Sequence, residues 1–147
     1  QDPNQLYRFE PDIDARTLTP GVLLVGLGGF IDAGNTQGLL VRHLLEASDA
    51  RVVASFDVDQ LLDYRGRRPS MIFEETRWAG YDDPALILYH LTDRDGTGYY
   101  LLAGPEPDYQ WERMIEAVRA IMARIGVSLV VTAHGIPMAV PHTRPAG

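Results

Sequence analysis

The residues of this chain best suited to binding a ligand lie in a glycine-rich segment near its start. An aliphatic run at 22–25 leads into a loop that carries Gly26, Gly28, Gly29 and Gly34, and an amphipathic segment follows. A strand, a glycine-rich turn and a helix N-terminus in this order form many small-molecule and anion sites in open α/β folds. The segment therefore indicates a ligand site whose chemistry its glycines alone do not specify.

The two standard nucleotide motifs are both incomplete in this loop. The dinucleotide fingerprint requires a third glycine at its sixth position, where this chain has Ile31. A phosphate-binding P-loop ends in lysine followed by serine or threonine, and the sequence contains no lysine. We therefore predict a close-packed turn, in which Asp32 and Asn35 either bind a ligand hydroxyl or stabilise the turn and cap the helix.

A second polar loop follows the last predicted strand and carries His134, His142 and Arg144. The two histidines have no short metal-binding spacing, and a zinc site would need further ligands, so we expect no metal. His134 either acts as a general acid or base or holds its own loop through hydrogen bonds. No Gly-x-Ser-x-Gly elbow is present, and no catalytic residue is assigned.

Hydrophobic periodicity predicts strands that alternate with helices along the chain. After an irregular arm at 1–20, we expect strands at 22–27, 51–58, 70–75, 85–92, 99–103 and 127–132, and helices at 35–47 and 108–125. Asp95-Gly96 predicts a tight hairpin turn, and Gly126 a helix end. This order predicts one domain over 1–147, a three-layer α/β/α sandwich with a mixed, mostly parallel sheet.

Side-chain spacing also predicts which parts of these elements are buried. The helix at 108–125 has one apolar stripe, assigned to the core, made of Trp111, Met114, Ile115, Val118, Ile121, Met122 and Ile125. Asp59 is predicted to cap a short helical turn, with Asp57 as a surface charge or its partner in a carboxylate pair. If the strands at 22–27 and 127–132 are neighbours, the loops after them line one crevice.

Composition excludes several classes of function. The net charge of −7 argues against binding to nucleic acid or to an anionic membrane. The absence of cysteine excludes thiol nucleophiles, disulfides and thiolate metal sites. No signal segment precedes the first strand, so we expect a cytoplasmic protein. We also expect no cofactor. The arginines at 65, 67 and 68 form a solvated loop or contact a phosphate or a partner.

Four blocks of sequence resemble the actinobacterial branch of the proteasome assembly chaperone 2 family. They are Val25-Gly-Leu-Gly-Gly-Phe-Ile-Asp-Ala-Gly-Asn35, Leu62-Asp-Tyr-Arg-Gly-Arg-Arg-Pro69, Leu101-Leu-Ala-Gly-Pro-Glu-Pro107 with Trp111, and Gly135-Ile-Pro-Met-Ala-Val-Pro-His-Thr-Arg-Pro145. The resemblance implies a phosphorylase/hydrolase-like fold, homo-oligomers and no inherited catalytic residue. It also implies that this chain is the N-terminal half of a longer fold, whose later strands and helices would follow residue 147.

Two hypotheses about function follow. The first is a non-enzymatic, oligomerising protein-interaction domain, because the family's named chaperones bind proteasome α subunits. Its partners would be its own copies and other proteins. The alternative is a small-molecule or anion-binding enzyme of the hydrolase or phosphorylase kind. That enzyme would use the crevice between the two loops, with Gly28, Gly29, Asp32 and Asn35 on one wall and His134, His142 and Arg144 on the other.

Overall fold

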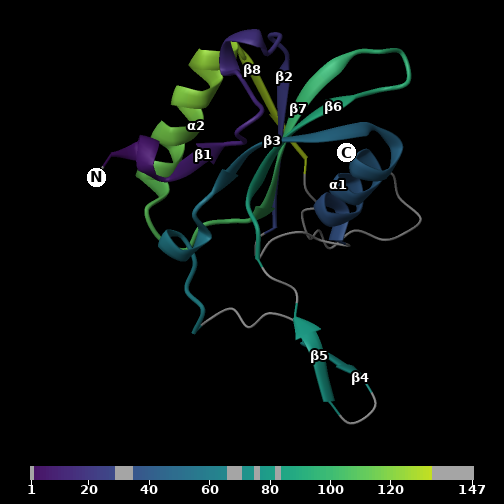
Figure 1. Ribbon diagram of the computed structural model, residues 1–147, viewed down its shortest axis with the longest axis vertical. Helices are drawn as coiled ribbons and strands as arrows, with labels where there is room; N and C mark the ends of the chain where they lie inside the picture. The colour runs from purple at the N-terminus through teal and green to yellow at the C-terminus, as the bar shows by residue number, and fades with distance from the viewer. Residues whose placement is uncertain (1, 29–34, 66–70, 75–76, 82–83, 134–147) are drawn as a thin grey trace, which may run out of the picture.

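A six-stranded sheet forms the centre of the computed structural model, which describes residues 2–28, 35–65, 71–74, 77–81 and 84–133 (Figure 1). In spatial order its strands are β1 (Tyr7–Phe9), β3 (Asp49–Phe56), β6 (Ile87–Thr92), β7 (Gly98–Pro105), β2 (Val22–Gly28) and β8 (Leu129–Thr132). The helix α1 (Thr36–Ala47) follows β2, and α2 (Trp111–Ile125) follows β7. The α/β class is therefore confirmed.

The sheet is mixed, as predicted, but it is not mostly parallel. Within the described ranges β2 pairs in parallel with β7 and with β8, whereas β1–β3, β3–β6 and β6–β7 are antiparallel. The predicted hairpin is one cause, because Gly96 has a φ of 80° and Asp93 N donates to Thr97 O at 3.0 Å. This turn folds β7 directly back onto β6 and places β6 antiparallel between two strands that run the other way.

The first 20 residues are not the irregular arm that the sequence predicts. β1 pairs with β3 at one edge of the sheet, and Leu6 just before it is fully buried. The short 3-10 helices η1 (Pro3–Gln5) and η2 (Ala15–Thr17) flank this strand, and aspartates cap both. A strand of three residues is too short to show a period of two, so its pairing became visible only in the tertiary structure.

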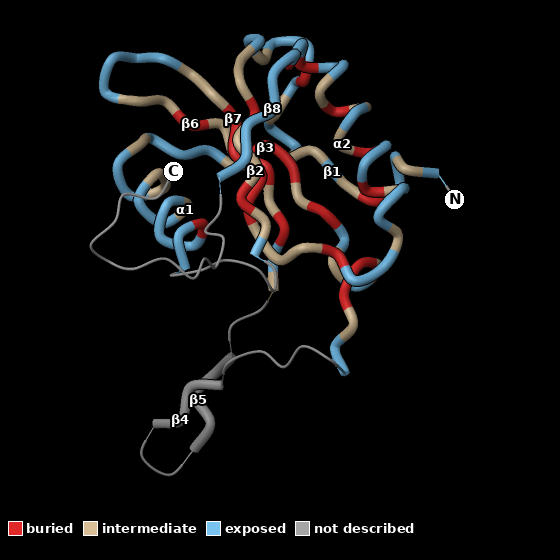
Figure 2. The backbone as a smooth tube through the Cα atoms, turned by 180° about the vertical axis from the view of Figure 1, so that it is seen from behind, coloured by how far each residue is buried: buried red, intermediate tan, exposed pale blue. Residues whose placement is uncertain are grey.

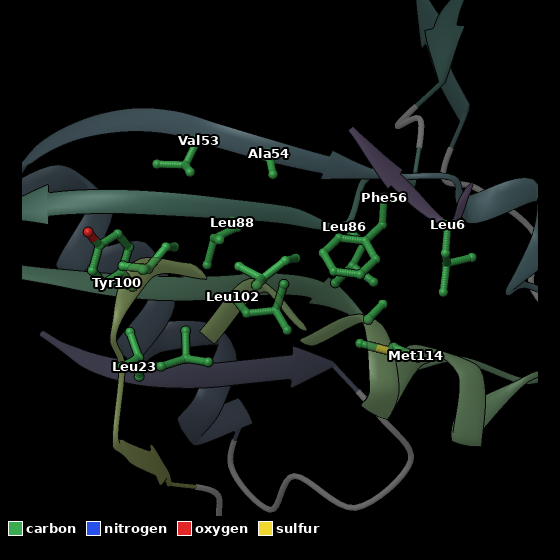
Figure 3. Close-up of a cluster of buried hydrophobic side chains, with 14 of the residues drawn as sticks. Leu6, Leu23, Val53, Ala54, Phe56, Leu86, Leu88, Tyr100, Leu102 and Met114 are labelled. Carbon is green, nitrogen blue, oxygen red and sulfur yellow. The ribbon is translucent and has the colours of Figure 1, made fainter. Parts of the chain in front are cut away.

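The two helices pack on opposite faces of the sheet. Alternate residues of β7 point to opposite sides: Tyr100 and Leu102 join the core cluster beneath α2, whereas Leu101 and Ala103 join the cluster beneath α1. Burial is concentrated on the central strands (Figure 2). Figure 3 shows the larger cluster, in which Met114 of α2 lies near the side chains of the inner strands.

Helix α2 is confirmed, and Gly126 ends it in the left-handed conformation with a φ of 88°. Its predicted core stripe is wrong at two positions, because Trp111 is 44% exposed and Ile115 is 46% exposed. The buried residues are Met114, Ala117, Ile121 and Ile125. The buried face is therefore turned away from Trp111 and Ile115, which lie on the flank of the helix.

Two local predictions between the helices also need correction. Asp57, not Asp59, caps the short helix η4 (Val58–Gln60), since its carboxylate accepts a hydrogen bond from the backbone N–H of Asp59 at 3.2 Å. The predicted strand at 70–75 is present as β4 (Met71–Glu74). It pairs with β5 (Arg77–Tyr81), which the sequence analysis missed, in a separate two-stranded sheet.

His90 on β6 should make stability depend on pH. Its ring lies edge-on to Tyr100, with centroids 5.1 Å apart, and burial, followed by the charge of Arg51, lowers its pKa. The folded state therefore favours the neutral ring, so this contribution to stability is present above the unfolded pKa of about 6.5 and is lost as the pH falls. We expect His90→Gln to flatten the decline in urea midpoint between pH 7 and pH 5, with exposed His43→Gln as the control.

Candidate functional site

The carboxyl ends of β2 and β7 form a topological switch point. The two strands are parallel neighbours, but the chain leaves β2 for the face covered by α1 and leaves β7 for the face covered by α2. The two chain segments separate beside the end of β2, where the N–H of Glu106 donates to the carbonyl oxygen of Gly28 at 2.9 Å. Ligands of open α/β folds bind at such points.

The predicted adjacency of the first and last long strands is correct. β2 and β8 pair in parallel from Val22–Leu129 to Val25–Thr132, so the chain leaves both strands at the same edge of the sheet. Of the predicted site residues, Gly28 ends β2 and Asn35 precedes α1. The other five lie outside the described residues, so their convergence stays a prediction: Gly29, Asp32, His134, His142 and Arg144.

Asn35 does not cap α1 in the way that the sequence predicts. Its backbone is left-handed, with a φ of 53°, and its side chain makes no capping hydrogen bond. The side chain instead lies against the first turn of the helix, since a Cβ at Gly38 would come within 2.4 Å of its Oδ1. Gly38 therefore provides the space that the Asn35 amide occupies.

A small cavity lies between α1 and the strands β2 and β8, with a volume of about 70 Å³. Among the described residues that line it, Gln37 alone has a polar side chain, which is 7% exposed and has its Nε2 3.5 Å from the carbonyl oxygen of Val25. The sequence analysis missed Gln37, because a glutamine in the first turn of a helix is usually at the surface. The cavity is smaller than the roughly 300 Å³ of a typical ligand pocket, and the part of its lining that the structure describes contains no arginine or histidine.

Four exposed apolar side chains form what we call the aromatic surface. They lie on the segment after η4 and at the start of α2: Tyr64 (43% exposed), Tyr109 (51%), Trp111 (44%) and Ile115 (46%). Trp111 and Ile115 are one helical turn apart and share a face of α2. The sequence analysis placed Trp111 and Ile115 in the core, and it did not join either to Tyr64.

Hydrogen bonds hold the two segments of the aromatic surface together. The N–H groups of Asp108 and Tyr109 both donate to the carbonyl oxygen of Leu61, at 2.8 and 3.0 Å. The N–H of Asp63 donates to the Asp108 carboxylate at 2.7 Å, and the Tyr64 hydroxyl donates to Asp59 at 2.7 Å. These bonds hold the two backbone segments together and fix the Tyr64 ring, while the aromatic side chains stay exposed.

Acidic side chains border the aromatic surface, together with one arginine, Arg65, whose charge acts on Tyr109 in the opposite direction. Loss of surrounding water raises the pKa of Tyr109, and so does a hydrogen bond between its side chain and Asp63, which keeps this phenol protonated. Asp59, Asp63 and Asp108 contribute to those hydrogen bonds, and Glu112 follows Trp111 in sequence. The nearby Arg113 points away, because its guanidinium donates to Gln60, Gln110 and the Asp2 carbonyl.

The described residues contain no group of three or more histidine, aspartate or glutamate side chains that could hold a metal ion. Within the same ranges, no helix is both long enough and apolar enough to cross a membrane. Two features of the described residues bear on the functions predicted from the sequence: the switch point with its small cavity, and the aromatic surface with its acidic border.

Comparison with known proteins defines the family. Residues 26–147 match the PAC2 family, and the chain belongs to this family. A Mycobacterium tuberculosis protein of unknown function, Rv2714, is similar in structure at 45% identity and a TM-score of 0.88, over 99% of this chain and 51% of its own. A Corynebacterium glutamicum protein of unknown function follows at 36% identity and 0.85, over 96% of this chain and 54% of its own.

A third structure is described as a proteasome-assembly chaperone homologue, Rv2125 of Mycobacterium tuberculosis. It is 26% identical, with a TM-score of 0.74, over 84% of this chain and 53% of its own. No curated protein matches the sequence. This chain therefore spans about half the length of the solved structures that it matches, and the predicted resemblance to the actinobacterial members of the family is confirmed.

Proposed function

We propose that this chain acts by binding protein rather than by catalysis, as an oligomerising interaction domain of the assembly-chaperone type. We further infer a cytoplasmic location, since a chain without cysteine needs no oxidising compartment to fold. The opposite placement of α1 and α2 supports a three-layer sandwich similar to phosphorylase and hydrolase folds as its frame.

The aromatic surface is the observation that carries this proposal. Tyrosine and tryptophan dominate the binding energy of protein interfaces, because a large rigid ring covers much area at a small entropy cost. Here two tyrosines and a tryptophan are each more than 40% exposed, although hydrogen bonds to Asp59 and between the two segments fix their positions. A surface ordered before binding loses less entropy when a partner docks.

The acidic border of the aromatic surface favours a basic partner. Asp59, Asp63, Asp108 and Glu112 would repel the same groups of a second copy docked face to face, whereas arginine or lysine on another protein would pair with them. Because one structural relative is described as a proteasome-assembly chaperone homologue, the proteasome α subunit of the same genome is the first partner to test.

The two modes of association should respond to salt in opposite directions. Screening at high ionic strength weakens attraction between unlike charges and repulsion between like charges. Between 50 and 500 mM NaCl we therefore expect binding to the recombinant α subunit to weaken, and self-association through the aromatic surface to strengthen. Biolayer interferometry and sedimentation velocity measure the two. Absence of any complex with the α subunit, together with a monomer at all concentrations, would contradict the proposal.

The alternative function, a small-molecule or anion-binding enzyme, has one observation in its favour. The switch point and the cavity beside Gln37 lie where α/β folds bind ligands. None of the described side chains that line the cavity is cationic, so an anion would need groups from the loops at 29–34 and 134–144. A ligand or ordered anion bound at the glycine loop, in crystals of the whole gene product, would support this function over the first.

A further inference from the structure

Two rings of the aromatic surface each have a carboxylate at the hydroxyl end. The Tyr64 hydroxyl donates to Asp59 at 2.7 Å, and the Tyr109 side chain has a hydrogen bond with Asp63. Asp59 is exposed and Asp63 is half-buried, and between the described residues neither carboxylate forms an ion pair. A carboxylate that accepts one hydrogen bond keeps lone pairs for a further donor. The surface therefore presents exposed aromatic rings together with carboxylates that can accept from a bound group.

The two arginines beside this surface leave its acidic character in place. The guanidinium of Arg113 donates to amide and backbone carbonyl oxygens, and to no carboxylate of the described residues. Loss of surrounding water has the largest effect on the pKa of Tyr109. Among the nearby charges, Asp63 and Asp108 each act on that pKa more strongly than Arg65 does. A cation brought by a partner would therefore meet an attractive field at the rings.

The combination of rings and carboxylates narrows the chemistry of the partner. An apolar partner would cover the rings but would bury carboxylates without a counter-charge, which costs free energy. An ammonium group would pair with a carboxylate, but it is compact and strongly hydrated. A guanidinium does both, because its flat face stacks on an aromatic ring while its N–H groups form a fork onto a carboxylate.

Both contacts already occur elsewhere in this chain. The guanidinium of Arg124 lies over the ring of Phe9, 5.0 Å from its centroid. Arg16 donates from Nε and Nη2 to the two carboxylate oxygens of Asp14, each at 3.0 Å. The aromatic surface offers the two kinds of contact together.

We propose that the aromatic surface binds an arginine side chain of its protein partner, with the guanidinium stacked on the exposed rings and paired with Asp63. Trp111 is the strongest candidate for the stacking, since tryptophan attracts a cation best of the three aromatic residues and this ring is 44% exposed. The inference rests on the proposed function, because it specifies the partner's chemistry at the same surface. It predicts selectivity for arginine over lysine, which attraction between opposite charges alone would not produce.

Two short peptides of equal charge test this selectivity on the unsubstituted chain. The chain contains two tryptophans, Trp78 and Trp111, so a 15N NMR spectrum contains two indole N–H signals, and the variant Trp111→Phe identifies the second. At about 150 mM NaCl we expect tetra-arginine amide to shift the Trp111 signal. Its Kd should be at least about fivefold lower than that of tetra-lysine amide.

Replacement of a single carboxylate provides the second measurement. Asp63→Asn removes the charge but keeps an oxygen that can accept from the N–H of Arg65, which lies 2.9 Å from the carboxylate. Asp95→Asn in the exposed hairpin turn removes the same charge elsewhere. We expect Asp63→Asn to raise the Kd for tetra-arginine amide at least about threefold, and the control to change it less than about 1.5-fold.

Three results would overturn the inference: equal Kd values for the two peptides, a Trp111 signal that does not move, or equal effects of the two substitutions. The proposed function is tested separately, by complexes with whole proteins. A complex that depends on Trp111, together with no preference for arginine, would reject this inference and leave the function standing. A preference for arginine without any such complex would reject the function instead.

Discussion

Gly104→Ala is expected to lower the free energy of unfolding by about 3 kcal/mol or more. Gly104 lies in β7 with a φ of 147°, which side chains rarely tolerate. An added Cβ would lie 2.3 Å from the carbonyl oxygen of Ala85 and 2.8 Å from the Cα of Leu86. Both are backbone atoms of the segment leading into β6, so the clash is relieved only by moving a strand at the centre of the sheet.

Gly96→Ala is the matched control for this substitution. Gly96 also has a positive φ, of 80°, but a Cβ there would meet no atom within 4 Å. Its replacement should therefore cost only the backbone strain of about 1 kcal/mol. Urea unfolding followed by circular dichroism measures both variants. If both substitutions lower the free energy of unfolding equally, the close approach of β7 to Ala85 is not what excludes a side chain at Gly104.

If the proteasome α subunit is the partner, as proposed above, Trp111→Ala is expected to weaken binding to it by about 30-fold or more, which corresponds to a hot spot of roughly 2 kcal/mol. The indole is 44% exposed at the start of α2 and is absent from the core cluster beneath that helix. Its loss should therefore change the unfolding free energy by less than about 1 kcal/mol. Titration by biolayer interferometry and urea unfolding of the same preparation separate the two effects.

Arg119→Ala provides the control on the same helix. Arg119 pairs with Glu116, one turn away, and the two side chains are 71% and 57% exposed. Exposed pairs of this kind contribute little, and Arg119 lies outside the aromatic surface. We expect its replacement to change affinity less than about threefold. If both variants weaken the complex equally, the aromatic surface is not the binding site.

The sequence predicted correctly those elements whose structure is determined by residues close together in the chain. The aliphatic run of β2, the turn at Asp95-Gly96 and the Gly126 end of α2 each depend on neighbouring residues, and all are present. β1 could not be found in this way, because three residues carry no detectable period and its pairing with β3 joins distant parts of the chain.

The burial of α2 shows why periodicity alone misplaced Trp111. A stripe of apolar residues defines the side of a helix that faces the core, but its width depends on what lies beneath. Here the buried face consists of Met114, Ala117, Ile121 and Ile125, and Trp111 lies outside it. Hydrophobicity predicted the helix correctly but not the exposure of its first turn.

The part of the candidate site that depends on strand order could be predicted from the sequence. The part that depends on hydrogen bonds between distant segments could not. The predicted crevice required the strands at 22–27 and 127–132 to be neighbours, and β2 and β8 do pair in parallel. The aromatic surface depends instead on backbone hydrogen bonds from Asp108 and Tyr109 to Leu61, which lie far apart in sequence. No local pattern joins Tyr64 to Trp111.

The most direct test of the proposed function is site-specific photo-crosslinking in living cells. A benzophenone side chain replaces Trp111 in one strain and Arg119 in another, and mass spectrometry identifies the products. Binding through the aromatic surface predicts a crosslink from position 111 to one defined protein, either another copy or a partner such as the proteasome α subunit, and none from position 119. Absence of a protein crosslink at position 111, or the same products from both positions, would contradict the account.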